Sequence, residues 1–384
     1  MIYVLFILCR CLQSKIIIPT VIICFISIAI AAILLGLLIK SQKTKRRSDR
    51  LFKYEISIEL NYILCCFIAT TSSLRWSSIG ITIAGISGIS GTGANQLDNP
   101  WGLAFDSSNA LYIADRLNNR VQKWEVNASA GITIGGQANG TGGSTLYDLM
   151  LPSFIQVDSS DNFYVTDVGN NRVQFWHYGA LSGSTIAGNG IVGNLNNQFN
   201  KPYGIARDIS TKTLYVADYD NHRIMQYRWG QLSGTVVAGG NGPGTNRTQL
   251  YQPVAVYFDS LSNSLFIVNY GAHNVVRWRL GDTSWSLVAG SINGTFGDSS
   301  TLLNCPIGIT LDPMGNVYVV DRNNHRVQLF LSDQSIGITI AGMSTVFGSN
   351  STLFNYPYAL ALDFQLNLYV SDRYNHRVQK FLRY

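Results

Sequence analysis

Cysteine and glutamate are scarce over most of this 384-residue chain. Five of the six cysteines precede residue 67, so Cys305 stands alone in the remainder and a disulfide framework there is excluded. Glu125 is the only glutamate after Glu59, which leaves few carboxylates for paired acid–base chemistry. The chain also lacks a Gly-x-Ser-x-Gly elbow and a P-loop, which argues against the hydrolases and nucleotide-binding proteins that carry them.

Excess positive charge is missing from the larger part of the chain as well. The formal net charge is +6, but residues 1–75 hold ten basic and three acidic side chains. Residues 76–384 hold eighteen basic and nineteen acidic side chains, a net charge of −1. The basic pI therefore belongs to the N-terminal region, and binding to nucleic acid is not expected of the rest.

Six copies of one phrase occupy this part of the chain, whose net charge is close to zero. The clearest copy is LYVADYDNHRIMQY at residues 214–227, and the others begin at Leu111, Phe163, Leu265, Val317 and Leu368. The fifth residues of successive copies are 51 or 52 residues apart. Such a fixed period predicts a repeat architecture, either closed or stacked.

Each repeat predicts four strands. The phrase alternates apolar and polar residues on either side of a polar turn, which is typical of a hairpin. An apolar run such as WGLAF precedes it and a segment such as ITIAG follows it. A proline marks the start of each apolar run, where a strand needs no backbone donor. These prolines are Pro100, Pro152, Pro202, Pro253, Pro306 and Pro357.

The two ends of the repeat region predict how it closes. The region begins with a fourth-strand segment, Ile81 to Gly85, and stops at Tyr384 after a third strand. Six four-stranded units close only if the first segment completes the last unit, as in a β-propeller. We therefore expect an all-β fold, a six-bladed β-propeller of four-stranded blades closed by an N-terminal strand.

The Pro-x-Gly-x-x-x-Asp, Leu-Tyr-Val-Ala-Asp and Asn-His-Arg-Val-Gln elements of these copies resemble NHL repeats. The resemblance covers about residues 79–384. The chain departs from the family pattern at Phe154, Ala255 and Ala359, where a glycine is expected, and in the hairpin of the fourth copy. The resemblance implies a propeller that serves as an interaction module.

The N-terminal region predicts a membrane anchor. Residues 16–39 form a run of 24 residues without a charge, long enough for one transmembrane helix after a short tail at 1–15. A cleaved signal peptide is the alternative. Residues 40–75 form a basic juxtamembrane linker with a short apolar stretch, Leu60–Thr70, and the propeller occupies 76–384. We expect a single-pass membrane protein; the side of the membrane depends on whether 60–70 also inserts.

We call the fifth residue of each copy of the phrase its marker. In five copies the marker is an Asp, and it forms a predicted structural pair with the Arg five residues later. The fourth copy loses both together, to Asn269 and Asn274, as expected if a lone buried charge is costly. The pairs are Asp115–Arg120, Asp167–Arg172, Asp218–Arg223, Asp321–Arg326 and Asp372–Arg377.

Four of the five histidines share one hairpin position, where the first two copies carry Asn119 and Asn171. Equivalent positions on separate blades are far apart, so we interpret them as turn formers and expect no metal and no cofactor. These histidines are His222, His273, His325 and His376.

Residues after the marker differ between copies and are candidates for binding a protein or glycan partner, because Tyr and Arg dominate interfaces. The loop-face candidates are Arg116, Tyr219, Asp220, Tyr270, Arg322, Arg373 and Tyr374. Solvated loop is the plain alternative. Asn-x-Ser/Thr triplets predict possible glycosylation at Asn127, Asn139, Asn246, Asn293 and Asn350.

Two functional alternatives stay open. Related propellers include metal-dependent lactonases and peptide-amidating lyases, which would need axial His or carboxylate side chains. The six expected inner strands contain no His or Glu, and Arg207 is their only charge. The other alternative, RNA binding, would need a clustered basic surface, for which only Arg116, Arg322 and Arg373 are candidates. A membrane-anchored, non-catalytic binding scaffold is the leading hypothesis.

Overall fold

The computed structural model describes residues 74–384, which form one compact unit. The predicted tail at 1–15, transmembrane helix at 16–39 and nearly all of the linker at 40–75 lie outside the described residues. Between residues 74 and 384, no helix is long and apolar enough to cross a membrane.

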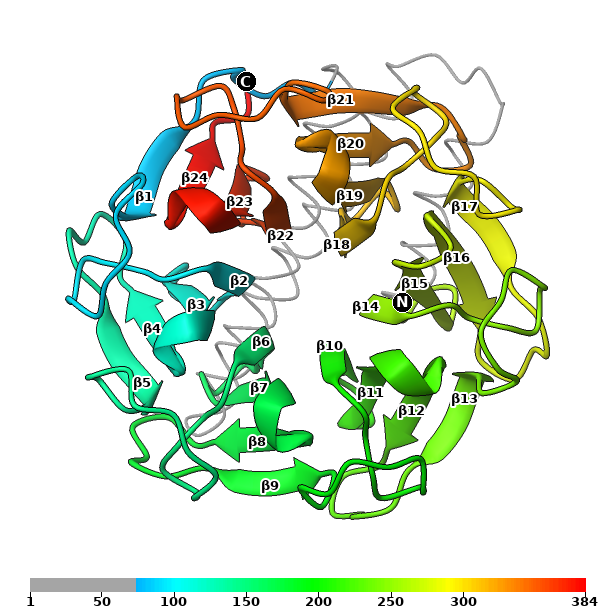
Figure 1. The fold of residues 1–384 in the computed structure, drawn as a ribbon, viewed down its shortest axis with the longest axis horizontal. Helices are drawn as coiled ribbons and strands as arrows, with labels where there is room; N and C mark the ends of the chain where they lie inside the picture. The colour runs from blue at the N-terminus through cyan, green and yellow to red at the C-terminus, as the bar shows by residue number, and fades with distance from the viewer. Residues whose placement is uncertain (1–73) are drawn as a thin grey trace, which may run out of the picture. The chain divides into compact units, whose positions relative to one another are not determined.

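Six four-stranded antiparallel sheets surround a central axis, as predicted (Figure 1). From the axis outward, blade 1 contains β2–β5, blade 2 β6–β9, blade 3 β10–β13, blade 4 β14–β17, blade 5 β18–β21, and blade 6 β22, β23, β24 and β1.

Strand bounds follow one pattern in every blade. The innermost strands are β2 (Pro100–Phe105), β6 (Pro152–Val157), β10 (Pro202–Asp208), β14 (Pro253–Asp259), β18 (Pro306–Leu311) and β22 (Pro357–Leu362). The second strands are β3 (Leu111–Asp115), β7 (Phe163–Asp167), β11 (Thr213–Asp218), β15 (Ser264–Asn269), β19 (Val317–Asp321) and β23 (Leu368–Asp372). The third strands are β4 (Arg120–Trp124), β8 (Arg172–Trp176), β12 (Arg223–Tyr227), β16 (Asn274–Arg279), β20 (Arg326–Phe330) and β24 (Arg377–Phe381). The outermost strands are β5 (Ile132–Gly136), β9 (Ser184–Ala187), β13 (Thr235–Gly239), β17 (Ser286–Gly290), β21 (Gly337–Gly342) and β1 (Ile81–Gly85).

The first strand closes the ring, which confirms the prediction from the two ends of the repeat region. β1 pairs with β24, with Ile81 opposite Lys380 and Gly85 opposite Arg377. Trp76 extends this closure, because its indole Nε1 donates to the carbonyl of Leu366 at 2.8 Å and its side chain is buried. Every blade therefore has four strands, and blade 6 does not lack its outer strand.

Burial is highest in the second strands, which are enclosed on both faces. All residues of β3, β7, β11, β15, β19 and β23 are buried, because each blade packs face to face against its two neighbours. The outer strands are more exposed, and in β1 and β5 only the fourth of five residues is buried, as expected for strands at the rim. Among the described residues the hydrophobic core forms four clusters, which lie largely between blades.

Close approach of adjacent inner strands explains the glycines of the Pro-x-Gly element. A Cβ added to Gly102 would lie 2.3 Å from the carbonyl oxygen of Ser153 in the next blade. A Cβ added to Gly204 would lie 2.6 Å from the Cα atom of Ala255. At these two positions a side chain would push neighbouring blades apart.

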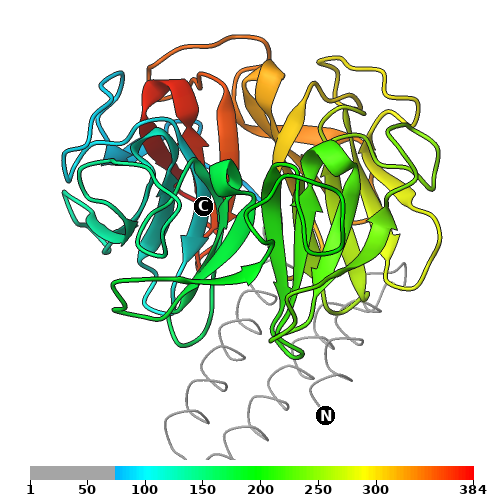
Figure 2. The same cartoon turned by 60° about the horizontal axis from the view of Figure 1, so that its bottom comes forward.

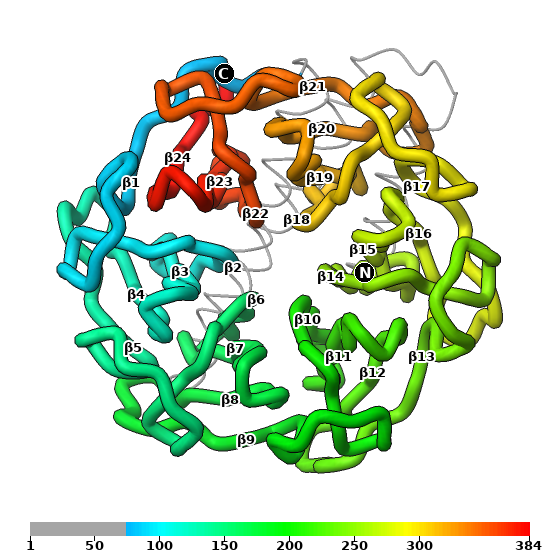
Figure 3. Tube along the Cα trace, viewed as in Figure 1, coloured from blue at the N-terminus to red at the C-terminus, as the bar shows by residue number. Residues whose placement is uncertain are grey.

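The turns between second and third strands and the loops between blades lie on one face of the propeller, which we call the upper face (top in Figure 2). In five blades the second and third strands are joined by a short 3-10 turn. These turns are η1 (Arg116–Asn118), η2 (Val168–Asn170), η3 (Tyr219–Asn221), η4 (Arg322–Asn324) and η5 (Arg373–Asn375). The loops between blades run over the same face, as the tube in Figure 3 shows, so both kinds of variable segment meet there.

Candidate functional site

The predicted Asp–Arg pairs lie under the upper face, one at the base of each 3-10 turn. In five blades the Asp Oδ2 atom lies 2.7–2.8 Å from the Arg Nε atom, and the Asp side chains are fully buried. Burial raises the pKa of Asp115 to about 6, against the lowering effects of its hydrogen bonds and of Arg120. The carboxylate remains ionised at neutral pH opposite its guanidinium group.

Each pair holds the preceding inter-blade loop in place. The second carboxylate oxygen accepts the backbone N–H of a loop residue, such as Asp98 for Asp115, at 2.7 Å. The Arg donates to loop carbonyls, and Arg120 reaches those of Thr92, Gly93 and Gln96. An Asn in the turn completes what we call the Asp–Asn–Arg network, since Asn118 donates to Asp115 and to a loop carbonyl. The charges of the network are thereby paired inside the protein, and most of its donors have acceptors there.

The fourth blade replaces the charged pair with a neutral one. Asn269 donates from Nδ2 to Oδ1 of Asn274 at 3.2 Å, and Asn274 donates to the carbonyl of Ser291. Asn269 also accepts the backbone N–H of Tyr251, though at 3.4 Å. The joint loss of Asp and Arg therefore leaves a smaller hydrogen-bonded set and no unpaired charge.

The four histidines share their position with Asn119 and Asn171, and all six residues connect one blade to the next. Each has a left-handed backbone with φ of 50–54°. Their Nδ1 or Oδ1 atoms accept the backbone N–H of the residue before the proline of the following blade, at 2.9–3.3 Å. Burial lowers the pKa of His222, His273 and His325, which favours the neutral ring that can accept.

Side chains of a different kind converge around the axis, and we call them the axial cluster. Its members occupy two equivalent positions of the repeat, the residue after the strand-initiating proline and the residue after the marker Asp or Asn, and come from every blade except blade 2. The cluster consists of Trp101, Arg116, Tyr203, Tyr219, Tyr270, Arg322, Tyr358 and Arg373.

Trp101 lies at the centre of this cluster. Its ring is 4.2 Å from that of Tyr358 and 5.3 Å from that of Tyr203, measured between centroids. The Arg116 Cζ atom stacks 3.8 Å from the Trp101 centroid, and the Arg373 Cζ atom lies 5.7 Å from it. Residues from blades 1, 3 and 6 thus meet across the axis (the inner ends of β2, β10 and β22 in Figure 1).

A row of tyrosines extends the cluster across blades 3 and 4 and meets the third arginine. Tyr219 lies 5.0 Å from Tyr203 and 6.1 Å from Tyr270. The Tyr270 hydroxyl accepts from Nη1 of Arg322 at 3.4 Å, and the Arg322 Cζ atom lies 5.2 Å from the Tyr358 centroid. Burial raises the pKa of Tyr270 to about 12, so its hydroxyl stays protonated at neutral pH.

The structure brings together five of the seven loop-face candidates and leaves two at the rim. Asp220 forms an ion pair with Lys201 at 2.9 Å. Tyr374 packs against Tyr356 at 5.5 Å and stays 42% exposed. The sequence analysis missed Trp101, Tyr203 and Tyr358, which it placed among inner-strand apolar residues. A signal for them was present in the sequence: the residue after the proline differs from one repeat to the next, as does the residue after the marker.

All five glycosylation candidates are exposed. Asn139, Asn246, Asn293 and Asn350 lie in loops between blades, and Asn127 lies in the turn after β4. The Oδ1 atom of Asn350 accepts the backbone N–H of Thr352 at 2.9 Å, as in a tight Asx turn. These positions are accessible to modification.

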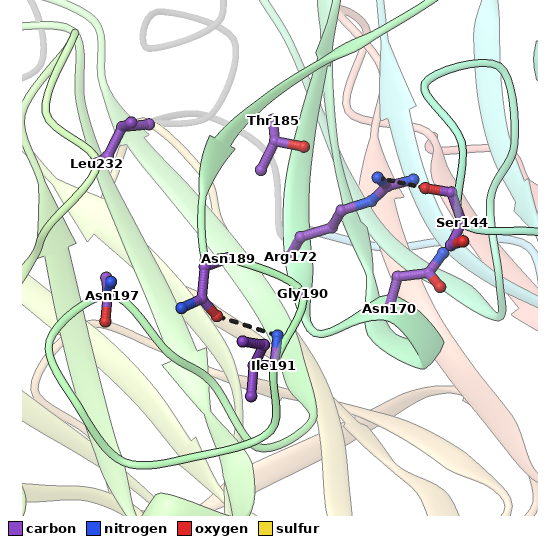
Figure 4. Close-up of a pocket in the computed structure, with 10 residues that line it drawn as sticks. Ser144, Asn170, Arg172, Thr185, Asn189, Gly190, Ile191, Asn197 and Leu232 are labelled. Atoms are coloured by element: carbon purple, nitrogen blue, oxygen red, sulfur yellow. Dashed lines mark hydrogen bonds between the residues drawn. The ribbon is translucent and has the colours of Figure 1, made fainter.

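A cleft of about 580 Å³ lies at the junction of blades 2 and 3, away from the residues of the axial cluster (Figure 4). It is lined by Arg172, Asn189, Ile191 and Leu232, among others. Arg172 is already committed to Asp167 and to the carbonyl of Ser144, so the cleft offers no free charge. Residues 74–384 contain no group of three His, Cys, Asp or Glu side chains placed to hold a metal ion.

Fold and repeat chemistry together define a class of protein, the six-bladed β-propellers. The NHL repeat model matches residues 97–124, 149–175, 199–227, 303–330 and 354–381. The fourth copy, with Asn269 and Asn274, lies outside the matched ranges. The chain is an NHL-repeat protein, as the resemblance of its motifs implied.

Two curated relatives match parts of the chain. It is 22% identical over 208 residues to Protein SUPPRESSOR OF QUENCHING 1, chloroplastic, of Arabidopsis thaliana, covering 47% of this chain and 20% of that protein. It is 32% identical over 103 residues to NHL repeat-containing protein 3 of Mus musculus, covering 27% and 28%. The matches therefore span less than a third of either relative.

Solved structures share the fold at low identity. An auxiliary nutrient binding protein from Bacteroides thetaiotaomicron aligns with a TM-score of 0.59 at 15% identity, covering 81% of this chain and 77% of that one. A gluconolactonase from Xanthomonas campestris aligns with a TM-score of 0.55 at 12% identity, covering 82% and 98%. The same architecture thus carries both binding proteins and enzymes, so function has to be argued from the site.

Proposed function

We propose that the propeller is a non-catalytic binding module whose ligand-binding site is the upper face around the axial cluster. The observation that carries this proposal is the convergence of three arginines, four tyrosines and Trp101 from five blades. Other blades fill the same positions with Ser153, Val168, Val254 and Ile307, so the fold itself does not require Arg or Tyr there. Arg, Tyr and Trp are the side chains that most often dominate binding energy.

The chemistry of the cluster favours binding over catalysis. Guanidinium groups and aromatic rings are not the ligands of a catalytic divalent metal, which prefers imidazole and carboxylate. The tyrosine hydroxyls are protonated at neutral pH, since burial raises the pKa values of Tyr203, Tyr219 and Tyr270. None of them is poised near neutrality, as an efficient general base would be.

Arrays of peptides and glycans, probed with the labelled full-length chain, test this proposal. We expect specific ligands whose signal falls in Tyr219→Ala, a half-buried member of the axial cluster. Tyr178→Ala is the matched control, because Tyr178 is 66% exposed in the turn after β8, outside the cluster. Equal loss in both variants, or turnover of a lactone panel by the wild type, would contradict a non-catalytic binding site at the axis.

We further propose that residues 16–39 anchor the propeller in a membrane as a single span. The support is the 24-residue uncharged run followed by the basic segment 40–53. Protease protection and glycosidase-shift mapping in microsomes test this, with Asn139 and Asn293 as exposed reporters. Recovery of the full-length chain in the soluble fraction would contradict the anchor.

A further inference from the structure

Three arginines of the axial cluster share the same aromatic rings. Arg116 and Arg373 both lie over Trp101, with Cζ–centroid distances of 3.8 and 5.7 Å. Arg373 and Arg322 both lie over Tyr358, at 4.5 and 5.2 Å. Three positive charges from blades 1, 5 and 6 are therefore gathered around two closely packed rings at the axis.

Their hydrogen-bond partners are all neutral. Arg116 donates to the carbonyl of Leu151 and to the hydroxyl of Ser153. Arg373 donates to Asn99 and Tyr358, and Arg322 donates to Tyr270 and Asn323. Within residues 74–384, no carboxylate oxygen lies within 4 Å of any of the three guanidinium groups. The cluster is thus a concentration of positive charge with no carboxylate in direct contact among the described residues.

Several donors in the cluster remain without an acceptor. The indole Nε1 of Trp101, in a side chain only 4% exposed, and the Nε atom of Arg322 are buried and have no hydrogen-bond partner. Within the described residues, the Nη2 atoms of Arg322 and Arg373 also make no hydrogen bond. Burial, together with the charge of Arg373, lowers the pKa of Arg116 to about 10. Both observations describe a site whose electrostatics would improve on binding an acceptor with negative charge.

We infer that the axial cluster binds the oxyanion group of a small acidic ligand, a carboxylate, sulfate or phosphate, between Arg116, Arg322 and Arg373. This inference rests on the proposed binding function and names the chemistry of its ligand. Each guanidinium group already donates to neutral partners, but the Nη2 atoms of Arg322 and Arg373 make no hydrogen bond among the described residues. The fork of donors on a guanidinium edge matches the spacing of oxyanion oxygens. The tyrosine row beside them would contact the remainder of the ligand.

A small ligand fits the surroundings better than a polyanion. Residues 76–384 carry a net charge of −1, and two acidic side chains lie near the cluster: Asp220 follows Tyr219, and Asp98 accepts from Asn99, a partner of Arg373. Asp98 lies 3.2 Å from His376, and Asp220 lies 2.9 Å from Lys201. A nucleic acid would need a continuous basic track, whereas these three arginines form one compact spot.

Isothermal titration calorimetry on the detergent-solubilised full-length chain tests the inference. The probes are sodium phosphate, sulfate, citrate and glucuronate, with glucose as the neutral counterpart of glucuronate. We expect at least one oxyanion to bind and glucose not to bind. Arg373→Gln should weaken that oxyanion about ten-fold or more, because a charge-assisted pair is lost. Arg373→Lys, which keeps the charge without the fork, should lie in between.

Arg228→Gln is the matched control, since it removes the same charge from an exposed residue in the turn after β12. Circular dichroism verifies that each variant is folded, and the wild-type titrations stand even if a variant is not. Absence of binding by all four oxyanions would overturn the inference. Equal binding of glucose and glucuronate would also overturn the inference, but it would leave the proposed binding function standing. If a decauridylate bound more tightly than every small oxyanion, the arginines would be assigned to a polyanion, and this result would also contradict the inference.

Discussion

The same turn of blade 6 contains two arginines with opposite surroundings. Arg377 is 3% exposed, pairs with Asp372 at 2.8 Å and donates to carbonyls of the preceding loop. Arg373, four residues earlier, rests on Tyr358 and Trp101 and has only neutral partners. Blades 1 and 5 repeat the contrast with Arg116 beside Arg120 and Arg322 beside Arg326. The recurring arginines of these hairpins are paired with aspartates, whereas the axial arginines have only neutral partners.

This contrast separates two uses of one hairpin. The Asp–Asn–Arg network fixes an inter-blade loop in five blades and therefore has to be self-sufficient. The axial positions do not have to fix a loop, since the apolar residues Val168 and Ile307 occupy them in blades 2 and 5. We attribute stability to the repeated network and recognition to the varied cluster.

Breaking one member of the network should have the largest effect. Asp218→Asn leaves the Arg223 guanidinium buried without its carboxylate, and such losses cost about 3–5 kcal/mol. The double variant Asp218→Asn/Arg223→Asn copies the neutral pair that blade 4 carries and should be less destabilised than the single variant. Urea unfolding followed by circular dichroism measures both. A double variant as unstable as the sum of its single changes would contradict the pairing.

The histidine and asparagine connections between blades should differ in their response to pH. Since the folded pKa values of His222, His273 and His325 lie below the unfolded value of about 6.5, protonation favours the unfolded chain. Stability from these three connections is complete above about pH 6.5 and is lost as pH falls below it. Asn119 and Asn171 make the equivalent bonds without titrating.

A triple variant, His222→Asn/His273→Asn/His325→Asn, sharpens that comparison. Its melting temperature should fall less than that of the wild type between pH 7.5 and 5, while both share the carboxylate contribution. Differential scanning calorimetry across this range measures the difference. If the melting temperatures of the wild type and the triple variant changed in parallel with pH, the Nδ1 acceptors would not contribute to the pH dependence of stability.

Two tyrosine hydroxyls offer a smaller test. Tyr227, 1% exposed, donates to the carbonyl of Asn196 at 2.9 Å, so Tyr227→Phe should cost about 1 kcal/mol. Tyr270 is only partly buried and accepts from Arg322 at 3.4 Å, so Tyr270→Phe should change stability by about 0.5 kcal/mol or less. Thermal melts of the two variants measure both, and the reverse order would break the comparison.

Most of the fold was predictable because the repeat reports it directly. The period of 51 or 52 residues predicts the number of blades, and the unmatched segment Ile81–Gly85 predicts the closure that the pairing of β1 with β24 confirms. The fixed spacing of Asp and Arg within one hairpin likewise predicts neighbours, because opposed residues in a two-stranded turn meet.

Contacts between blades were not predictable in the same way. Asn119 bonds to Leu151, and Trp101 stacks under Arg116 and beside Tyr203. These residues come from separate turns, strands and blades, and their separation depends on the tilt and radius of the ring, which the period does not specify. The axial cluster therefore emerges only when the blades are placed around the axis.

The most direct test compares Arg373→Gln with Arg377→Gln in the full-length chain, by the free energy of unfolding in urea. The account predicts a loss of about 3–5 kcal/mol for Arg377→Gln, whose removal leaves the buried Asp372 unpaired. It predicts a loss of about 1 kcal/mol or less for Arg373→Gln, which has no carboxylate partner among residues 74–384. Equal, large losses in both variants would show that the axial arginines serve the fold and would contradict their assignment to recognition.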